Sequence, residues 1–331
     1  MMKYLFVLIC FGAITVNGTY AQKAKPKPVN IILDSDMGPD YDDVGAIAIL
    51  HALADNGEAK ILATIASTKY PRVAGVLNLF NVYFNRRDIP VGVPMGDALE
   101  LRDSQHWTDT ILAKYPYKLR SNAAAWNAVN LYRKTLSLQP DKSVTIVTVG
   151  FLTNLSDLLN SAPDEYSNLD GKALVAKKVK LLVCMAGKFP SGFEFNVMKD
   201  VKASQNVYQN WPTEVILSGF EIGAKIMAGL PLIHNDSINN SPVKDVFRIS
   251  IPMAKEDSLG RKSWDETAVL VAIRGYSKYY TLRPGRMKVA DDGSNTWDNT
   301  GKGQAYLVEK VDYTEVQKLI NDLIQHQPVL R

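Results

Sequence analysis

Ten residues of the sequence, DSDMGPDYDD at positions 34–43, hold a dense group of acidic side chains. Carboxylates packed this closely repel one another and raise each other's pKa unless a cation lies among them. Carboxylates and backbone carbonyls are the oxygen ligands that a hard cation such as Ca²⁺ takes in proteins. The stretch therefore predicts a divalent cation site, against the simpler alternative of a solvated turn whose acids cap the next helix. The acids are Asp34, Asp36, Asp40, Asp42 and Asp43.

The spacing of these acids differs from that of other metal and phosphate motifs. An EF-hand loop starting at Asp34 would need Gly at its sixth position and Glu at its twelfth, where the sequence has Pro39 and Gly45. Neither a Walker A loop nor a GxGxxG motif follows the apolar run that precedes the acids. The Asp-x-Asp pair also occurs in Mg²⁺-dependent phosphatases of the haloacid dehalogenase type, but residues 37–39 do not fit that pattern. A phosphatase is therefore the remote alternative.

Apolar segments on both sides position the acidic stretch. The run VNIIL at 29–33 predicts a strand, and residues 44–53 have the apolar spacing of a helix, which Gly57 closes. The same alternation continues along the chain. It predicts strands at 59–68, 88–96, 143–150, 177–187 and 213–223 and helices at 72–84, 121–136, 152–160 and 202–211. This pattern is typical of an α/β fold with an open, mostly parallel, doubly wound sheet of the Rossmann type and helices on both faces.

In such a sheet, ligands bind beyond the carboxyl ends of the strands. The acidic stretch follows the first strand, Val149 and Gly150 end the strand 143–150, and KFPSGFEFN at 188–196 follows the strand 177–187. A further acid, Asp265, opens an apolar helical run within RKSWDETAV. We expect all of these segments to meet at one edge of the sheet. The turn-rich segment DDGSNTWDNTGKG at 291–303 predicts a surface loop, with a segment that covers the edge of the site as the alternative.

Composition restricts the class of protein. The 331 residues are 46% hydrophobic and 22% charged, as in a globular protein with a full core, and the net charge of +4 is too small to indicate a nucleic-acid partner. Residues 1–21 have the form of a secretory signal peptide, with Thr19 and Ala21 before the cleavage point. Lipid anchoring at Cys10 is disfavoured because Ile9 precedes it. We expect an exported protein, periplasmic or secreted, with a leader at 22–29, one catalytic domain at 30–331, and no membrane contact after signal removal.

Only Cys184 remains in the mature chain, so an intramolecular disulfide cannot form there. Its place in the apolar run KLLVCMAG predicts a small core residue rather than a nucleophile.

Taken together, these motifs resemble the nucleoside hydrolase family (inosine-uridine preferring nucleoside hydrolases). The likeness rests on D-x-D-x-G followed by Asp-Asp, on TVGFLTNL at 148–155, on EFN at 194–196 and on WDETAV at 264–269. It extends from about Ile31 to the end of the chain. The commoner family form is DxDPGxDD, so DxDMGxDxDD indicates a variant branch with two more residues before the Asp-Asp pair.

This resemblance implies a small-molecule substrate, a ribonucleoside or related N-riboside, and Ca²⁺-dependent cleavage of its N-glycosidic bond. Asp36 would bind the metal and take the proton from the attacking water. The other implied metal ligands are Asp43, the backbone carbonyl of Val149, and Asp265. The implied substrate-binding residues are Asp42, Glu194 and Asn196 at the sugar and Met185 packed beside it, where a core role for Met185 is the alternative. Trp264 is a further candidate, stacked on the base, with simple packing as its alternative. The family also suggests a homo-oligomer.

The sequence departs from the family at the leaving group. Many members have a His before the last metal-binding Asp, and that His protonates the departing base, but here the position is Trp264. His106 is a weak candidate for a replacement acid, and a surface or core role for it is simpler. The loop at 186–193 is shorter and lacks an Asn that often holds the sugar, while Phe189, Phe193 and Phe195 are candidates for the wall of the base pocket. A non-catalytic ribose or nucleoside binder that retains the metal site is therefore the alternative function.

Overall fold

The computed structural model describes residues 27–329 of the chain. The predicted signal peptide at 1–21 and most of the predicted leader lie outside the described residues, so export stays a prediction. Within residues 27–329, no helix combines the length and the apolar composition that crossing a membrane requires.

An eleven-stranded sheet forms the centre of the molecule, in the order β4-β3-β2-β1-β5-β6-β8-β13-β11-β12-β7. The strands from β4 to β13 in that order pair in parallel, and β11, β12 and β7 extend the sheet as antiparallel strands. The parallel strands are β1 (Val29–Ser35), β2 (Ala59–Ala66), β3 (Val91–Val93), β4 (Trp126–Asn127), β5 (Val144–Thr148), β6 (Val179–Met185), β8 (Glu214–Ser218) and β13 (Gln304–Glu309). The antiparallel strands are β7 (Ser191–Phe193), β11 (Tyr280–Val289) and β12 (Ser294–Asp298).

Helices cover both faces of this sheet. The first core lies under α1 (Asp42–Asp55), α2 (Val73–Tyr83), α11 (Pro242–Ser250), α12 (Trp264–Arg274) and α13 (Tyr313–Ile324). The second core lies under α4 (Ala128–Ser137), α5 (Thr153–Asn160), α6 (Gly171–Lys178) and α8 (Val201–Asn210). Ile31 and Leu33 of β1 belong to the first core and Ile32 to the second, as the alternation of side chains along a strand requires. The predicted α/β fold with a mostly parallel sheet is confirmed.

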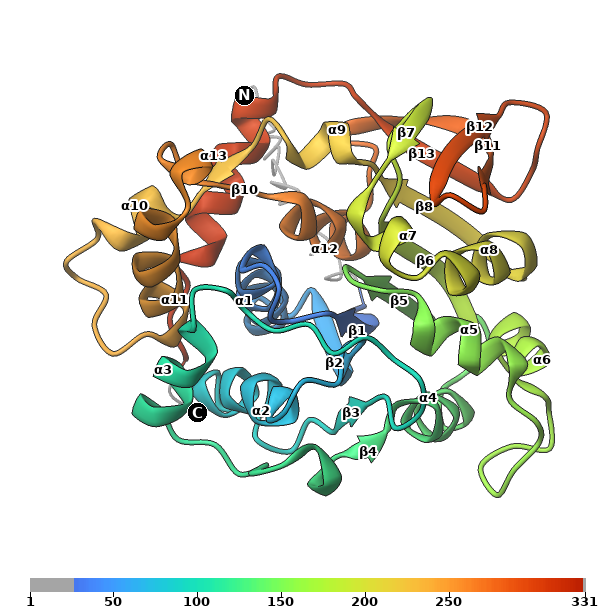
Figure 1. The fold of residues 1–331 in the computed structure, drawn as a ribbon, viewed down its shortest axis with the longest axis horizontal. Coiled ribbons are helices and arrows are strands. Elements are labelled where there is room, and N and C mark those ends of the chain that lie inside the picture. Colours follow the sequence, from blue (N-terminus) through green and yellow to red (C-terminus); the bar gives the residue numbers. More distant parts are fainter. Residues whose placement is uncertain (1–26, 330–331) are drawn as a thin grey trace, which may run out of the picture.

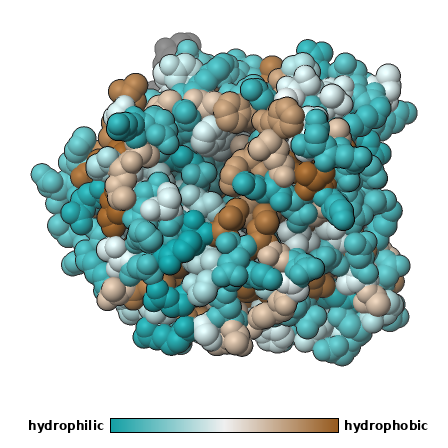
Figure 2. All heavy atoms as spheres, in the orientation of Figure 1, coloured by the Kyte–Doolittle hydropathy of each residue, from teal (hydrophilic) through white to brown (hydrophobic). Residues whose placement is uncertain are grey.

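Shorter elements complete the structure around this frame. They are α3 (Trp107–Lys114), α7 (Phe195–Lys199), α9 (Phe220–Gly223), α10 (Leu230–Ile233), three short 3₁₀ turns, and a separate antiparallel pair of β9 (Met227–Ala228) with β10 (Arg261–Lys262). In Figure 1, α10 and α11 lie on the left and the hairpin of β11 and β12 on the upper right, with α1 and α12 between them. On the same face, Figure 2 shows hydrophilic residues around the periphery and several hydrophobic ones near the centre.

Three predicted elements differ from those observed. The strand expected at 213–223 ends at Ser218, and residues 220–223 form the helix α9 instead. The segment 121–136 was expected to be one helix, but residues 122–124 form a 3₁₀ turn and Trp126 and Asn127 pair with β3 before α4 begins. The predicted surface loop at 291–303 contains β12, which pairs with β11 and with β7. The polar sequence of β12 has no apolar alternation from which a strand could be predicted. β12 forms because its backbone hydrogen-bonds to a strand on each side, which supplies the stability that buried side chains supply elsewhere. Cys184 is buried in β6 as a core residue, as predicted.

The order of the strands places a switch point beside β1. The chain adds β2, β3 and β4 on one side of β1 and then β5, β6 and β8 on the other. Helices after neighbouring strands therefore diverge between β1 and β5, which opens a crevice at the carboxyl ends of these strands.

Candidate metal centre and active site

A cavity of about 180 Å³ lies at this crevice. Its lining comes from segments that are far apart in the sequence, namely the loop after β1, the start of α1, the ends of β5 and β6, the segment at β7 and α7, and the starts of α9 and α12. All nine residues that the sequence predicted for the site are among the lining residues. They are Asp36, Asp42, Asp43, Val149, Met185, Glu194, Asn196, Trp264 and Asp265.

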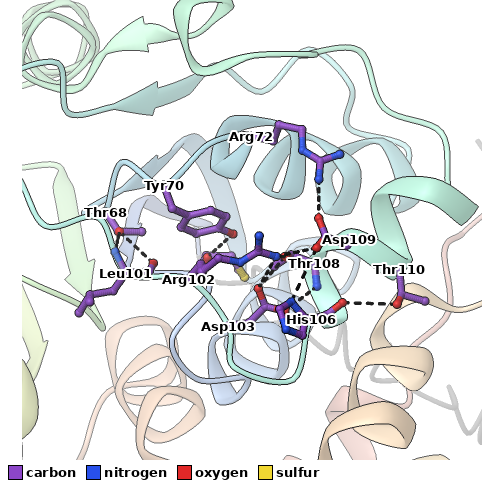
Figure 3. Close-up of polar contacts among 11 residues, drawn as sticks. Thr68, Tyr70, Arg72, Leu101, Arg102, Asp103, His106, Thr108, Asp109 and Thr110 are labelled. Carbon is purple, nitrogen blue, oxygen red and sulfur yellow. Dashed lines mark hydrogen bonds and ion pairs between the residues drawn. The ribbon is translucent and has the colours of Figure 1, made fainter.

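The acidic loop is fixed by its own hydrogen bonds and by the neighbouring strand. The Ser35 hydroxyl donates to Oδ1 of Asp43 over 2.5 Å and accepts from the backbone N–H of Met37. The Tyr70 hydroxyl donates to the carbonyl of Met37 over 2.8 Å, and Figure 3 shows this ring among the residues of the adjoining loop. The path of the chain from Asp36 to Asp43 therefore does not depend on a metal alone.

A close approach of two strand ends brings Val149 beside Asp36. A Cβ atom on Gly150 would lie 2.4 Å from the backbone nitrogen of Asp36, so only glycine allows this contact. The backbone N–H of Val149 donates to the carbonyl of Asp34 over 2.8 Å. These contacts hold the Val149 segment against the acidic loop, where its carbonyl was predicted to bind the metal.

Three carboxylates form the tightest acidic group in the described part of the chain. Asp42, Asp43 and Asp265 each offer an oxygen, and these oxygens lie within 4.8 Å of one another. Oδ2 of Asp43 is buried without a hydrogen-bond partner among residues 27–329. An all-oxygen group with an unpaired carboxylate oxygen fits a hard divalent cation such as Ca²⁺. Asp36 lines the same cavity, and Asp42, which was predicted for the sugar, lies within the carboxylate group.

Burial and mutual repulsion act together on these acids. Burial raises the pKa of Asp36 well above its usual range, and the charges of Asp43, Asp40 and Asp42 raise it further. The pKa values of Asp43 and Asp265 are also raised well above the usual range, first by burial and then by the neighbouring carboxylates. A cation among them would offset this repulsion and favour the charged forms.

Asp34, the first acid of the stretch, lies outside the cavity lining. Its carboxylate is fully buried and accepts hydrogen bonds from the Tyr132 hydroxyl over 2.8 Å and from the Asn154 amide over 3.1 Å. Burial raises the pKa of Asp34 to about 7, and both of these hydrogen bonds oppose the shift. Asp34 therefore anchors the start of the loop through Tyr132 and Asn154 and does not line the cavity.

Glu194 and Asn196 are held by backbone contacts. The Glu194 carboxylate caps α7 by accepting from the N–H groups of Asn196 and Val197, and it also accepts from the N–H of Gly187. The Asn196 amide donates to the carbonyls of Val149 and Met185, each over 3.2 Å. These contacts join the ends of β5 and β6 to α7. The two residues thus shape this end of the cavity.

Aromatic side chains also line the cavity. Phe193, Phe195, Phe220 and Trp264 are among the lining residues, whereas Phe189 stacks on Tyr306 at 4.4 Å outside it. The indole N–H of Trp264 donates to the carbonyl of Phe220 over 2.8 Å, so it is already used within the protein. This wall is suited to stacking on a planar base, but the Trp264 N–H does not offer a proton to one.

His106 lies away from this cavity. It precedes α3 with a side chain that is 70% exposed, and Figure 3 shows it beside Asp103 and Asp109. It is not among the lining residues, which removes the candidate replacement for the family's leaving-group acid.

Three residues at the site were not assigned by sequence reasoning. Asp40 and Phe220 line the cavity, and Arg261 is a buried cation bonded to Asp40 and Asp42. The signal for Arg261 was its position three residues before Trp264 and the need of five clustered acids for a positive charge.

Comparison with known proteins assigns the chain to a family. Residues 31–318 match the family model described as inosine-uridine preferring nucleoside hydrolase. The chain belongs to this family. The members of the nucleoside hydrolase family are N-glycosyl hydrolases, the enzyme class that the sequence predicted.

Individual relatives agree with this membership. The pyrimidine-specific ribonucleoside hydrolase RihA of Enterobacter sp. (strain 638) is 31% identical over 236 residues, which are 68% of this chain and 67% of the relative. The plant nucleoside hydrolase PpNRh1 has a TM-score of 0.69 at 19% identity, covering 90% of this chain and 99% of that one. An inosine-uridine preferring nucleoside hydrolase from Bacillus anthracis has a TM-score of 0.68 at 15% identity, with the same coverages. At such identities the two structures support the fold.

Proposed function

We propose that this nucleoside hydrolase family member cleaves the N-glycosidic bond of ribonucleosides in a Ca²⁺-dependent reaction. The observation that carries the proposal is the convergence of nine predicted residues, from distant segments, on one cavity that contains a group of three close carboxylates. Asp36, Asp43, Asp265 and the Val149 carbonyl would hold the metal. When bound, Ca²⁺ would supply positive charge that offsets the carboxylates and polarises water.

The side chains of the cavity have distinct roles in this proposal. The bond between C1′ of the ribose and the base nitrogen breaks, and a new bond forms between C1′ and the oxygen of water. Asp36 takes a proton from that water, and the carboxylates of the cavity stabilise the positive charge that develops on the sugar. Asp42 accepts a hydrogen bond from a ribose hydroxyl, and the aromatic wall stacks on the base. The departing base takes its proton from solvent, because neither Trp264 nor His106 is placed to donate one.

A panel of purine and pyrimidine ribonucleosides, assayed for free ribose with Ca²⁺ present, tests this function. Uridine and cytidine belong in the panel because the relative RihA is named pyrimidine-specific. We expect ribose release by the wild type and a loss of about 10²- to 10⁴-fold in Asp36→Asn, the range for removing a general base. The matched control is Asp170→Asn, which alters the cap of α6 far from the cavity lining and should leave turnover unchanged.

The bond between Trp264 and Phe220 also favours the alternative, a nucleoside binder without turnover. Calorimetric titration with the same nucleosides separates the two functions, because binding without ribose release supports the alternative. Phosphate release from nucleoside monophosphates, with no ribose release from nucleosides, would contradict both.

A further inference from the structure

Arg261 is a buried cation at the edge of the acidic cavity, 7% exposed and carried by the two-residue strand β10. Its Nη2 lies 2.8 Å from Oδ1 of Asp42 and 2.8 Å from Oδ1 of Asp40, and its Nη1 lies 3.5 Å from Oδ2 of Asp257. A charge buried this deeply is tolerated only when it is paired and hydrogen-bonded. Three carboxylates surround this one guanidinium.

The acidic loop closes around Arg261. Every residue of the tripeptide Asp40-Tyr41-Asp42 contacts its side chain, since the guanidinium carbon also lies 5.0 Å from the centre of the Tyr41 ring. The Tyr41 hydroxyl donates to Oδ2 of Asp257 over 2.6 Å and so links the loop to the segment before β10.

The other side of the guanidinium faces the aromatic wall. Its carbon lies 5.3 Å from the centre of the Trp264 ring, which lines the cavity. Arg261 therefore contacts both the acid assigned to the ribose and the ring assigned to the base. Arginine suits this place because its planar fork binds a carboxylate in a fixed direction and packs on aromatic faces, whereas lysine offers a single point charge.

Both hydrogen bonds that Arg261 donates to Asp42 reach the same carboxylate oxygen. Nε and Nη2 of Arg261 both donate to Oδ1, over 3.1 Å and 2.8 Å. None of the hydrogen bonds within residues 27–329 reaches Oδ2 of Asp42. Two donors on one oxygen fix the carboxylate and leave its second oxygen as the acceptor for a ligand hydroxyl.

Resting on the function proposed above, we propose that Arg261 is a positioning residue that sets the specificity for ribose. It orients Oδ2 of Asp42 toward a ribose hydroxyl and holds the Trp264 ring beside the base. Loss of Arg261 leaves three carboxylates without their cation, so Asp42 turns away from its working position. Loss of Arg261 therefore weakens recognition of the sugar hydroxyl more than it lowers turnover in general.

The test compares a ribonucleoside with its 2′-deoxy analogue, using wild type, Arg261→Lys and Arg261→Met. We expect Arg261→Met to lower kcat/KM for uridine on the order of 10- to 100-fold, the size of losing charge-assisted hydrogen bonds, with a much smaller loss for 2′-deoxyuridine. In Arg261→Met, the ratio of kcat/KM for uridine to that for 2′-deoxyuridine should fall to the ratio measured for Asp42→Asn. The double variant that combines Arg261→Met with Asp42→Asn should show little further decrease in this ratio, because both changes act on one interaction. For Arg261→Lys we expect a ratio between those of the wild type and Arg261→Met.

Arg274→Met is the matched control, because Arg274 makes a two-pronged pair with Glu58 and is not among the cavity-lining residues. It should keep the preference for ribose whatever it does to thermal stability. Equal losses on both substrates in Arg261→Met, or an unchanged preference in a folded variant, would show that Arg261 serves stability alone. If Arg261→Met does not fold, Arg261→Lys decides between these outcomes.

A binding measurement separates this inference from the proposed reaction. The ratio of D-ribose to 2-deoxy-D-ribose affinity, obtained by calorimetry, should fall in Arg261→Met even if the wild type cleaves no nucleoside. In that case the proposed hydrolysis is wrong while the role of Arg261 stands. If neither sugar binds to the wild type, or the ratio is the same in both proteins, the role of Arg261 is wrong.

Discussion

The acidic residues of this cavity are buried beside other acids, and both conditions disfavour their charged forms. Asp36, Asp43 and Asp265 all line this cavity, and burial raises the pKa of each well above its usual range. Arg261 supplies one positive charge, but it lies with Asp40, Asp42 and Asp257 rather than with Asp36. A divalent cation would supply the rest, which is why the carboxylate group and Ca²⁺ belong together in our account.

Trp264 gives the first prediction at the scale of the residue. Its indole N–H is bonded to Phe220, so Trp264→Phe should keep the stacking surface and change kcat for uridine by less than about 10-fold, because it removes no acid. Trp264→Ala should raise KM by about 5- to 150-fold, the equivalent of the ~1–3 kcal/mol that base stacking contributes. Steady-state kinetics on uridine and on 4-nitrophenyl riboside measure both effects. If Trp264→Phe loses turnover of uridine alone, the indole is the leaving-group acid after all.

Most residues of the site could be predicted from the sequence. They follow the ends of predicted strands, in an order of motifs that resembles a known family. Asp36, Val149 and Asp265 needed only a motif and a rule about where parallel strands end. Arg261 and Phe220 were missed because their roles depend on which side chains meet in space. The indole of Trp264 was identified by position, but only the structure gave its bond to Phe220.

At the scale of elements, two helices determine how the carboxylates meet. α1 begins with Asp42 and Asp43, and α12 carries Asp265 and Glu266 in its first turn. Neither N-cap residue, Tyr41 or Ser263, makes a side-chain capping bond. The positive end of each helix therefore favours the acids, and both ends face the cavity. The contact between α1 and α12 thus sets the distance between the proposed metal ligands.

Gly45 of α1 packs against the buried Glu266 side chain of α12, and it gives the second prediction. A Cβ on Gly45 would lie 2.0 Å from Oε1 and 2.9 Å from Cγ of Glu266, so in Gly45→Ala the Glu266 side chain, or the helix that carries it, must shift. We expect a loss of about 1–3 kcal/mol in the free energy of unfolding, as for an overpacked core, together with weaker Ca²⁺ binding. Thermal unfolding and calorimetry measure the two effects.

Gly96→Ala is the control, because nothing lies within 4 Å of a Cβ at that position. It should match the wild type in both measurements. Wild-type Ca²⁺ affinity in Gly45→Ala would show that the helix contact does not set the metal site.

Element boundaries were less predictable than the elements themselves. The apolar runs of β1, β5 and β6 are buried on both faces of the sheet, so their sequences predict them directly. β12 has the polar sequence SNTWD, and it becomes a strand because β11 and β7 pair with it. This pairing matters for the site, since β7 leads directly into Glu194.

For the whole molecule, the sheet order explains why the cavity lies where it does. β1 stands between β2 and β5, where the chain reverses the direction in which it adds strands. The acidic loop after β1 therefore meets the end of β5 over a crevice that no crossover helix fills. The alternation of strands and helices predicted an open, mostly parallel sheet with ligands at the carboxyl ends of its strands, but the strand order and the antiparallel extension came only from the structure.

The third prediction concerns stability and pH. The folded-state pKa values of Asp36, Asp43 and Asp265 are raised above the unfolded values of about 4. Their contribution to stability is complete below that pH and is lost as pH rises through the folded values. In metal-free protein these three groups should therefore lower the Tm as pH rises from about 4 toward neutral, whereas carboxyl groups with lowered pKa values, such as Glu58 and Asp164, act in the opposite direction. Because Ca²⁺ binds the charged forms, the increase in Tm that it causes should be larger at pH 7.5 than at pH 5.

Scanning calorimetry with chelator and with Ca²⁺ at both pH values measures this difference. Groups remote from the cavity contribute equally with and without Ca²⁺ at a given pH, so they cancel in this difference. An equal increase in Tm at the two pH values would mean that these carboxylates do not bind the ion.

The most direct test of a Ca²⁺-dependent ribonucleoside hydrolase is a metal titration of chelator-treated protein, with ribose release from the best nucleoside as the readout. We expect no release without metal, and recovery that saturates at one Ca²⁺ per chain in the wild type. Asp43→Asn should need more Ca²⁺ for the same recovery, because it removes the carboxylate with the unpaired buried oxygen. Full ribose release in the presence of chelator, or none from any ribonucleoside with Ca²⁺ bound, would contradict the account.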